Sequence, residues 1–533
     1  MLRLTEIRLP LDHTGEELKQ AILARLEIPE NELRGFTVYR RNHDARKKTA
    51  IVFSYTVDVE TANEKNILDR FQKHPHIRPA PDMTYHFVAH APDKPFSRPI
   101  IVGCGPCGLF AALILAQSGF RPIVLERGKN VRERTQDTFG FWRERQLNPE
   151  SNVQFGEGGA GTFSDGKLHT QIRDPGHYGR KVLTEFVKAG APEEILYIGK
   201  PHIGTFKLVR IIEQMRGEII SLGGEFHFQT RVDDLLIENR RIRGVILENG
   251  EIIHSDHVVL APGHSARDTF KMLHKQGVHI EAKPFSIGFR IEHPQSLIDA
   301  CRLGPYAGNP LLGAADYKLV HHCKNGRSVY SFCMCPGGTV VAAASEPGKL
   351  VTNGMSQYSR NERNANAAIV VDITPDDYPG SPLAGIAFQR QLEQKAFELG
   401  GSNYNAPCQL VGDFLKGQPS TRLGTVEPSY LPGVTPCDLS EALPAYAIEA
   451  LREAIPAFER TIPGFALEDA VLTGTETRTS SPIRIVRNRE TLQSINIKGL
   501  YPAGEGAGYA GGILSSAVDG IQVAEAIAKA ICR

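Results

Sequence analysis

Two glycine-rich segments at distant points of the chain are the residues best suited to hold a phosphorylated ligand. The first, GCGPCG (103–108), follows an apolar, strand-like segment and begins an apolar, helix-like one. Gly103 permits a tight turn, Gly105 lets the backbone approach a pyrophosphate, and Gly108 lets the helix pack closely on the strand. The helix N-terminus adds free N–H groups and a partial positive charge. This pattern predicts a dinucleotide site whose contacts are Gly103, Gly105, Pro106, Cys107 and Gly108.

An acidic residue follows where a dinucleotide-binding fold needs one. Glu126 lies 18 residues past Gly108, at the end of a second strand-like segment, 122–125. A carboxylate in that place can accept hydrogen bonds from both ribose hydroxyls. We therefore expect Glu126 and its neighbour Arg127 beside the ribose.

The second glycine-rich segment, GEGAGYAGGI (504–513), favours FAD as the dinucleotide. It lies where a strand-like segment, 500–503, meets a long helical segment, 513–531. Its glycines let backbone amides reach a ligand, and the helix dipole would stabilise negative charge on a reduced flavin. A glycine-rich loop without a ligand is the alternative. Because the chain has no second strand–GxGxxG–helix, NAD(P)H as a reductant is expected to bind only transiently at the flavin pocket.

The composition is that of an ordinary globular protein. The 533 residues suffice for roughly two to four domains, and a net charge of +1 gives no bias toward nucleic acid or an anionic membrane. Nine scattered cysteines favour a reducing cytoplasm over a disulfide framework. The uncharged stretch 99–120 is long enough for a membrane helix, but its glycines and prolines favour a strand–turn–helix. We expect a cytoplasmic protein without a signal peptide or membrane span, and the oligomeric state stays open.

The order of predicted elements divides the chain into three domains. Residues 1–92 read β-α-β-β-α-β, with the last strand near 83–89, which is typical of a ferredoxin-like α+β domain. Residues 98–280 and 470–533 contain both glycine-rich segments and are predicted to form a discontinuous, Rossmann-like α/β domain that binds FAD. Residues 281–469 are predicted to form an inserted, β-rich substrate domain.

Eight segments together carry a more specific pattern: GCGPCGLFAALILAQSG (103–119), ERG (126–128), FGEGGAGTFSDGKLHT (155–170), VVLAPGHSARDTF (258–270), GFRIEHPQ (288–295), SFCMCPGG (331–338), TRTSSPIRI (477–485) and YPAGEGAGYAGGILSSAVDGI (501–521). With them the chain resembles a family of bacterial flavoproteins described as FAD-dependent dehydrogenases. The resemblance implies an FAD domain of the glutathione-reductase type, preceded by a small α/β domain, and it implies no substrate. Cys104 and Cys107 depart from the small residues expected in the first turn, and we interpret both as packing residues.

The resemblance also implies further cofactor contacts. Ala261-Pro262-Gly263 corresponds to a short motif that ends a strand near the FAD, and Val232 falls where backbone groups hold the adenine. Residues 158–162 would pass the pyrophosphate and the flavin. The implied contacts are Gly159, Ala160, Gly161, Thr162, Val232, Ala261, Pro262, Gly263, Gly504, Glu505, Gly511, Gly512 and Ile513.

The residues expected to face a substrate are less distinctive. A thiol of Cys333 or Cys335 beside a flavin could exchange electrons or form an adduct, and inert thiols at a buried strand end are the alternative. Arg290 and Lys167 could bind an anionic substrate, with ion pairing as the alternative. The catalytic candidates are therefore Cys333, Cys335, Arg290 and Lys167.

No metal site is expected from the sequence. The run His321-His322-Cys323 is the most suggestive one, because it places imidazole and thiol ligands close together. It lacks a second ligand pair at the spacing of a zinc site.

The leading hypothesis is an FAD-dependent oxidoreductase that acts on an unidentified small molecule. One alternative is an FAD-dependent RNA-associated or RNA-modifying protein, since Phe53 and Tyr55 alternate on a predicted strand beside the basic loop 40–48. The first strand has no aromatic residue, so nucleic acid is not an expected partner. The other alternative is a non-catalytic, flavin-bound scaffold or sensor.

Overall fold

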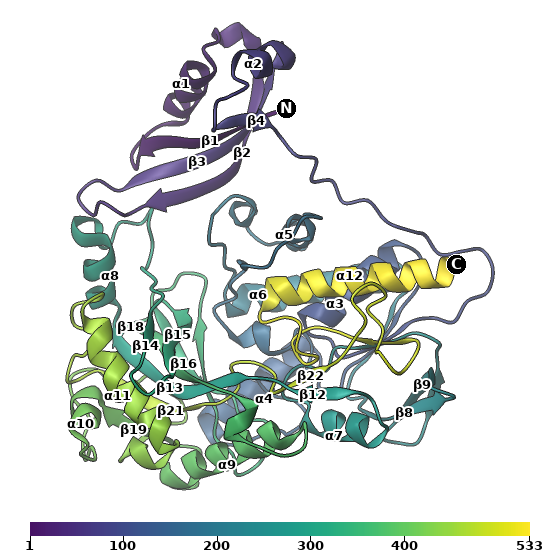
Figure 1. Cartoon of the computed structure of the whole chain (residues 1–533), viewed down its shortest axis with the longest axis vertical. Coiled ribbons are helices and arrows are strands. Elements are labelled where there is room, and N and C mark those ends of the chain that lie inside the picture. The colour runs from purple at the N-terminus through teal and green to yellow at the C-terminus, as the bar shows by residue number, and fades with distance from the viewer.

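An N-terminal unit, residues 1–79, stands apart from the body of the computed structural model, which describes residues 1–533 (Figure 1). Its sheet has the strand order β2-β3-β1-β4. The elements are β1 (Leu2–Pro10), α1 (Gly15–Leu26), β2 (Leu33–Asp44), β3 (Val52–Thr61), α2 (Glu64–Arg70) and β4 (Ile77–Pro79). Helix α1 begins at a capping box in which Thr14 and Glu17 each accept a hydrogen bond from the other's backbone N–H.

The last strand of this unit is not at 83–89, where the sequence predicted it. Strand β4 pairs with the start of β1, from Ile77 opposite Leu4 to Pro79 opposite Leu2, and ends where β1 offers no further partner. Residues 83–89 instead belong to an extended segment that leads to the body. Their alternating Tyr85 and Phe87 pack against the apolar core around α3 (Pro106–Gln117).

A five-stranded parallel sheet carries the cofactor motifs, and we call it the cofactor sheet. Its order is β23-β11-β5-β6-β7. The strands are β5 (Ile100–Val102), β6 (Ile123–Leu125), β7 (Glu225–His227), β11 (Val258–Leu260) and β23 (Leu500–Pro502). The helices of this part are α3, α4 (Val131–Glu144), α5 (Tyr178–Lys188), α6 (Thr205–Ser221), α7 (Arg267–Lys275) and α12 (Ile513–Cys532). An antiparallel meander adds β8 (Val232–Glu238), β9 (Arg241–Leu247) and β10 (Ile252–His254).

A seven-stranded sheet, the inserted sheet, forms the other half of the body, in the order β14-β15-β18-β13-β21-β19-β20. Its strands are β13 (Phe285–Pro294), β14 (Val320–His322), β15 (Ser328–Cys335), β18 (Asn364–Ile373), β19 (Ala406–Leu410), β20 (Val434–Pro436) and β21 (Val471–Glu476). Its helices are α8 (Gln295–Leu303), α9 (Ala384–Leu399), α10 (Val411–Lys416) and α11 (Ala445–Glu459). Two small pairs complete the body: β12 (Ile280–Ala282) with β22 (Ile483–Ile485), and β16 (Gly338–Ala342) with β17 (Thr352–Ser356).

One detail corrects the expected elements of the body, and another confirms them. Strand β21 lies past the expected boundary at residue 469, yet it pairs with β13 and β19 in the inserted sheet, so the chain returns to the cofactor sheet only after Glu476. The uncharged stretch 99–120 forms β5, a turn and α3. No helix of the structure combines the length and the apolar character that crossing a membrane requires.

Helices α3 and α12 lie side by side under the cofactor sheet, with their backbones in direct contact (Figure 1). At the contact, a Cβ placed on Gly520 would lie 2.2 Å from the carbonyl oxygen of Cys107. Because that neighbour is backbone, it cannot move aside as a flexible side chain could. Glycine is therefore required at position 520 for α12 to reach α3.

We predict that Gly520→Ala lowers the free energy of unfolding by about 1–3 kcal/mol, since it overpacks this contact. Gly217→Ala, in α6, is the matched control, because nothing lies within 4 Å of its added Cβ. The control should be neutral or stabilise by up to about 1 kcal/mol, because alanine favours helix more than glycine does. Thermal unfolding followed by circular dichroism measures both, and equal midpoints for the two variants would contradict the packing argument.

Candidate functional site

The two glycine-rich segments line one cavity of about 380 Å³ between the cofactor sheet and the inserted sheet. All the predicted cofactor residues line it except Gly108 and Thr162. A Cβ on Gly108 would lie 1.9 Å from the carbonyl oxygen of Gly103, so this glycine serves close packing of helix on strand, as predicted. Thr162 lies beneath the loop, beside Gly158 and the Arg134 guanidinium.

The glycines permit four chain segments to touch at the floor of this cavity. A Cβ on Gly103 would lie 2.2 Å from the Ala261 carbonyl oxygen, and one on Gly159 would lie 2.9 Å from the Gly105 Cα. A Cβ on Gly504 would lie 2.9 Å from the Cβ of Cys107. The cavity is therefore a cradle of bare backbone, which side chains at these positions would fill.

Cys104 and Cys107 are buried beneath this cradle, and both are free thiols. Burial raises the pKa of both thiols well above the ordinary value. A protonated, enclosed thiol is a poor nucleophile. This agrees with their interpretation as packing residues.

Glu126 organises the first turn through its carboxylate. Its Oε2 accepts the N–H of Cys104 at 2.8 Å, and its Oε1 accepts the N–H groups of Gly128 and Gly156 at 2.9 and 3.0 Å. The side chain is buried and lines the cavity. The Oε2 atom accepts only one of these N–H groups and retains capacity for another donor, so the placement suits the predicted contact with a ribose hydroxyl.

Arg127 has different partners from those of Glu126. Its guanidinium pairs with Glu150 at 2.8 Å and with Asp268 at 2.9 Å, and it lies over the ring of Phe155. These contacts hold Arg127 at the cavity wall. Arg231 also lines the cavity and pairs with Glu150, and the sequence patterns did not indicate it.

Arg134 was also not indicated by any motif, yet it fixes the loop that faces the first turn. It is fully buried and has no carboxylate partner. Its guanidinium donates to the carbonyl oxygens of Asn152, Val153 and Glu157 at 2.7–2.8 Å. A single side chain thus gathers the carbonyls of the irregular segment 152–157.

Of the four catalytic candidates, Cys333 and Lys167 line the cavity, whereas Cys335 and Arg290 lie behind its wall. Strand β15 contains a bulge between Phe332 and Cys335, and Cys333 adopts φ +43°. Both cysteines are free thiols. The bulge turns the Cys333 side chain toward the cavity while Cys335 stays buried.

Two neighbouring cations favour the thiolate form of Cys333. A hydrogen bond from Cys335, together with the nearby Lys167 and Arg290 cations, lowers the pKa of Cys333 below the usual thiol value, although burial opposes the shift. Arg290 donates to the Cys333 carbonyl oxygen at 2.9 Å and pairs with Glu476 at 3.0 Å. Arg290 is thus a positioning residue that does not touch the cavity.

Lys167 lines the same cavity as Cys333. Its ammonium pairs with Asp165 at 2.7 Å and donates to the Met334 carbonyl oxygen. Two more residues line the cavity: Glu476, the last residue of β21, which no motif indicated, and Arg478, which lies just past that strand within a predicted motif. Of the other polar residues within these motifs, His169 lines the cavity, whereas His293, Ser480 and Arg484 do not.

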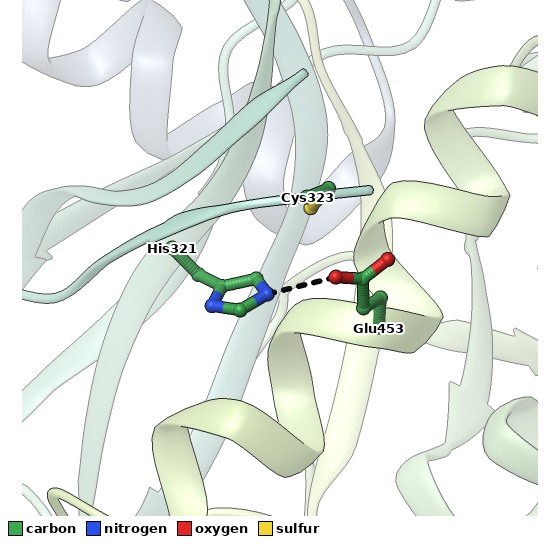
Figure 2. Close-up of side chains that lie close together, drawn as sticks. All are labelled: His321, Cys323 and Glu453. Atoms are coloured by element: carbon green, nitrogen blue, oxygen red, sulfur yellow. Dashed lines mark hydrogen bonds and ion pairs between the residues drawn. The ribbon is translucent and has the colours of Figure 1, made fainter. Parts of the chain in front are cut away.

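Figure 2 shows one cluster of metal-ligand types outside the cavity, formed by His321, Cys323 and Glu453. Helix α11 supplies Glu453, which sequence spacing could not associate with the other two. The imidazole Nε2 lies 3.0 Å from the carboxylate, the Lys324 N–H donates to both carboxylate oxygens, and the Cys323 thiol donates to the Ala450 carbonyl. The ligand atoms thus have partners within the protein, and the expectation of no metal stays a prediction.

A buried ionic network joins the two sheets beside the cavity. Glu393 of α9 accepts from Arg267 of α7 at 2.6 and 2.9 Å and from Arg478 at 2.9 and 3.0 Å. Although burial opposes it, the two guanidinium groups hold the pKa of Glu393 well below its usual range. Arg478 also donates to Ser265 and Ser345, so the network ties the cavity wall to both parts of the chain.

We predict that Glu393→Gln destabilises the protein by about 3–5 kcal/mol, because it leaves two buried cations without a full countercharge. Glu398→Gln on the same helix is the control, since Glu398 is exposed and should be nearly neutral. Urea unfolding measures both variants. Equal midpoints would show that the network contributes little.

Comparisons with known proteins agree with the cofactor motifs. A model of the family described as "FAD-dependent protein, C-terminal domain-like" matches residues 284–479, and one described as "Domain of unknown function (DUF8436)" matches residues 1–60. An uncharacterized protein of Clostridium beijerinckii is 49% identical over 534 residues, which cover 99% of this chain and 98% of that protein.

Solved structures show a weaker likeness. Glycine oxidase from Geobacillus kaustophilus aligns with 81% of this chain and 95% of its own at 12% identity and a TM-score of 0.36. Glycerol-3-phosphate dehydrogenase from Bacillus halodurans, complexed with FAD, aligns with 82% of this chain at 12% identity and a TM-score of 0.36, and the chain spans 64% of its length. At these values the likeness does not extend to a reaction or a substrate. By its full-length identity, the chain belongs to the same family as the clostridial protein, and its residues 284–479 match the model of a family of FAD-dependent proteins.

Proposed function

We propose that this protein is an FAD-dependent oxidoreductase of the dehydrogenase kind that acts on a small molecule. One observation carries the proposal. A single cavity is lined by the two glycine-rich segments and by a thiol, an amine and a carboxyl group, from Cys333, Lys167 and Glu476. The proposal includes an FAD domain of the glutathione-reductase type and a ferredoxin-like N-terminal domain, which the parallel cofactor sheet and the β2-β3-β1-β4 order support.

The residues present fit the cofactor. The backbone cradle has room for a ligand because Gly103, Gly159 and Gly504 carry no side chains. The N-termini of α3 and α12 both border the cavity. Residues 103–107 would hold the pyrophosphate, Glu126 the ribose, and residues 511–513 the pyrimidine end of the flavin. When bound, FAD supplies the capacity to accept or donate a hydride.

The inserted sheet would supply the substrate side. Lys167 would bind and orient a polar or anionic group, because its ammonium reaches the cavity while Asp165 fixes its position. The Cys333 thiolate would take up the proton released when a substrate C–H or O–H bond is broken. Arg290 holds the bulge and Glu476 in place from behind.

We predict that the purified protein is yellow and that its flavin is reduced under anaerobic conditions by a small-molecule donor. NADH, NADPH and then candidate metabolites are added while the visible spectrum is recorded, and loss of the flavin band identifies the donor. Rapid bleaching by NADPH or NADH would support a transient nicotinamide reductant. A bound flavin that no metabolite mixture bleaches would overturn the enzyme proposal and favour the scaffold or sensor.

We predict that Cys333 is alkylated by iodoacetamide at neutral pH and that its rate falls on acidification at a lower pH than the rate of an ordinary thiol, because its thiolate is stabilised. Lys167→Met should move the midpoint of this fall to higher pH, because it removes a cation that stabilises the thiolate. Bound FAD should slow the reaction, since Cys333 borders the same cavity. The alkylated peptides are quantified by mass spectrometry, with the exposed Cys532 as internal comparison; equal effects on both thiols would contradict the assignment.

The packing of Phe53 and Tyr55 argues against the alternative of an RNA-associated protein. Phe53 and Tyr55 are each 5% exposed, and both lie edge-on to His13. Neither ring offers a free face on which a base could stack. The basic residues of the neighbouring loop remain accessible and border a different cavity.

A further inference from the structure

A second cavity, of about 1730 Å³, lies between the N-terminal unit and the body, and we call it the interdomain groove. It is lined by the β2–β3 hairpin and by residues near 194–202, 302–316 and 358–360. Its wall contains eight Arg or Lys residues and four Asp or Glu residues. Since the whole chain carries a net charge of only +1, the groove is a local concentration of positive charge.

Half of these cations have no carboxylate partner. Arg8, Arg46 and Lys200 pair with acidic residues of the groove, and Arg360 pairs with an acidic residue outside it. The cations without such a pair are Arg25, Arg41, Lys48 and Arg302. Against these four stands one carboxylate without a cation, that of Glu194, which accepts the Tyr358 hydroxyl. Such an excess attracts and holds anions.

A thin wall separates the groove from the flavin cavity. Arg360 lines the groove and donates to Asp165 at 2.5 and 2.9 Å, and Asp165 pairs on its other side with Lys167 of the cavity. The backbones of the two walls are paired here, since Lys167 forms an isolated β-bridge with His202, which lines the groove. Arg360 is held at φ +51°, a conformation that costs energy in a non-glycine residue.

We propose that the interdomain groove binds a small phosphorylated anion, such as a nucleotide, and that the Arg360–Asp165–Lys167 chain couples its occupancy to the flavin cavity. An anion that draws Arg360 away from Asp165 leaves the carboxylate paired with Lys167 alone. The positive potential of Lys167 in the cavity then falls. The coupling rests on the proposed function, whereas the anion site does not.

The groove suits a compact phosphate ligand better than a nucleic acid. Its four cations without a carboxylate partner line one groove and come from α1, β2, the β2–β3 hairpin and α8, so together they suit a chain of phosphates. The Phe53 ring is covered by the Arg41 guanidinium, 4.9 Å away, and is not free to stack on a base. The volume exceeds that of the flavin cavity, so a ligand of nucleotide size has room.

The experiment titrates the flavin-loaded protein with tripolyphosphate, ATP and adenosine by isothermal calorimetry, and records the flavin spectrum in parallel. Tripolyphosphate and ATP should bind and adenosine should not. Lys48→Gln/Arg302→Gln should weaken the binding of tripolyphosphate at least tenfold, since both residues are exposed and their loss leaves the fold intact. The control Lys275→Gln/Arg489→Gln removes the same charge elsewhere on the surface and should change binding less than twofold.

Saturating tripolyphosphate should also shift the visible flavin band, and Arg360→Gln should abolish the shift while some binding remains. No calorimetric binding, or equal weakening in both double variants, would overturn the site. Binding without a spectral shift would overturn the coupling. Tighter binding of a short single-stranded RNA than of tripolyphosphate at the same salt would assign the groove to nucleic acid instead. Because calorimetry does not depend on turnover, these outcomes are separate from a failure of the oxidoreductase proposal.

Discussion

The direct packing of α12 on α3 is the contact on which the cofactor cavity depends. The two helices begin at glycine-rich segments from opposite ends of the body, and Gly520 lets their backbones meet. Only at this distance can Gly504 lie against Cys107 and Gly103 against Ala261. A side chain at any of these points would separate the segments, so the cradle and the helix packing both require glycine.

The substrate side of the cavity depends on burying charge rather than on removing side chains. Glu393 holds two arginines from different parts of the chain, and Arg290 holds the bulge that presents Cys333. Buried ion pairs of this kind stabilise less than apolar packing would, but they permit few alternative arrangements. They fix the orientation of the inserted sheet relative to the cofactor motifs, and with it the position of Cys333 and Lys167.

The segment 165–168 contributes side chains to the flavin cavity and to contacts with the wall of the interdomain groove. Lys167 faces the flavin cavity, while Asp165 reaches Arg360 in the wall of the interdomain groove. The N-terminal unit, which has its own sheet, completes that groove with β2 and the β2–β3 hairpin. The unit thus lies where a ligand bound to it can alter the charges around the candidate thiolate, although none of its residues lines the flavin cavity.

The sequence by itself determined the cofactor turn, because the roles of Gly103, Gly105 and Glu126 follow from local geometry: a strand, a turn and a helix close in sequence. It also indicated most of the cavity lining, since those residues lie within recognisable motifs. It misplaced the last strand of the N-terminal unit, where Tyr85 and Phe87 alternate because they pack on α3 rather than in a sheet. Tertiary structure alone decided that Glu476 and Arg231 reach the cavity, that Arg290 stays behind it, and that Arg360 joins it to the groove. Each of these depends on contacts between residues far apart in sequence, whose energies come from burial and charge pairing and leave no local pattern in the chain.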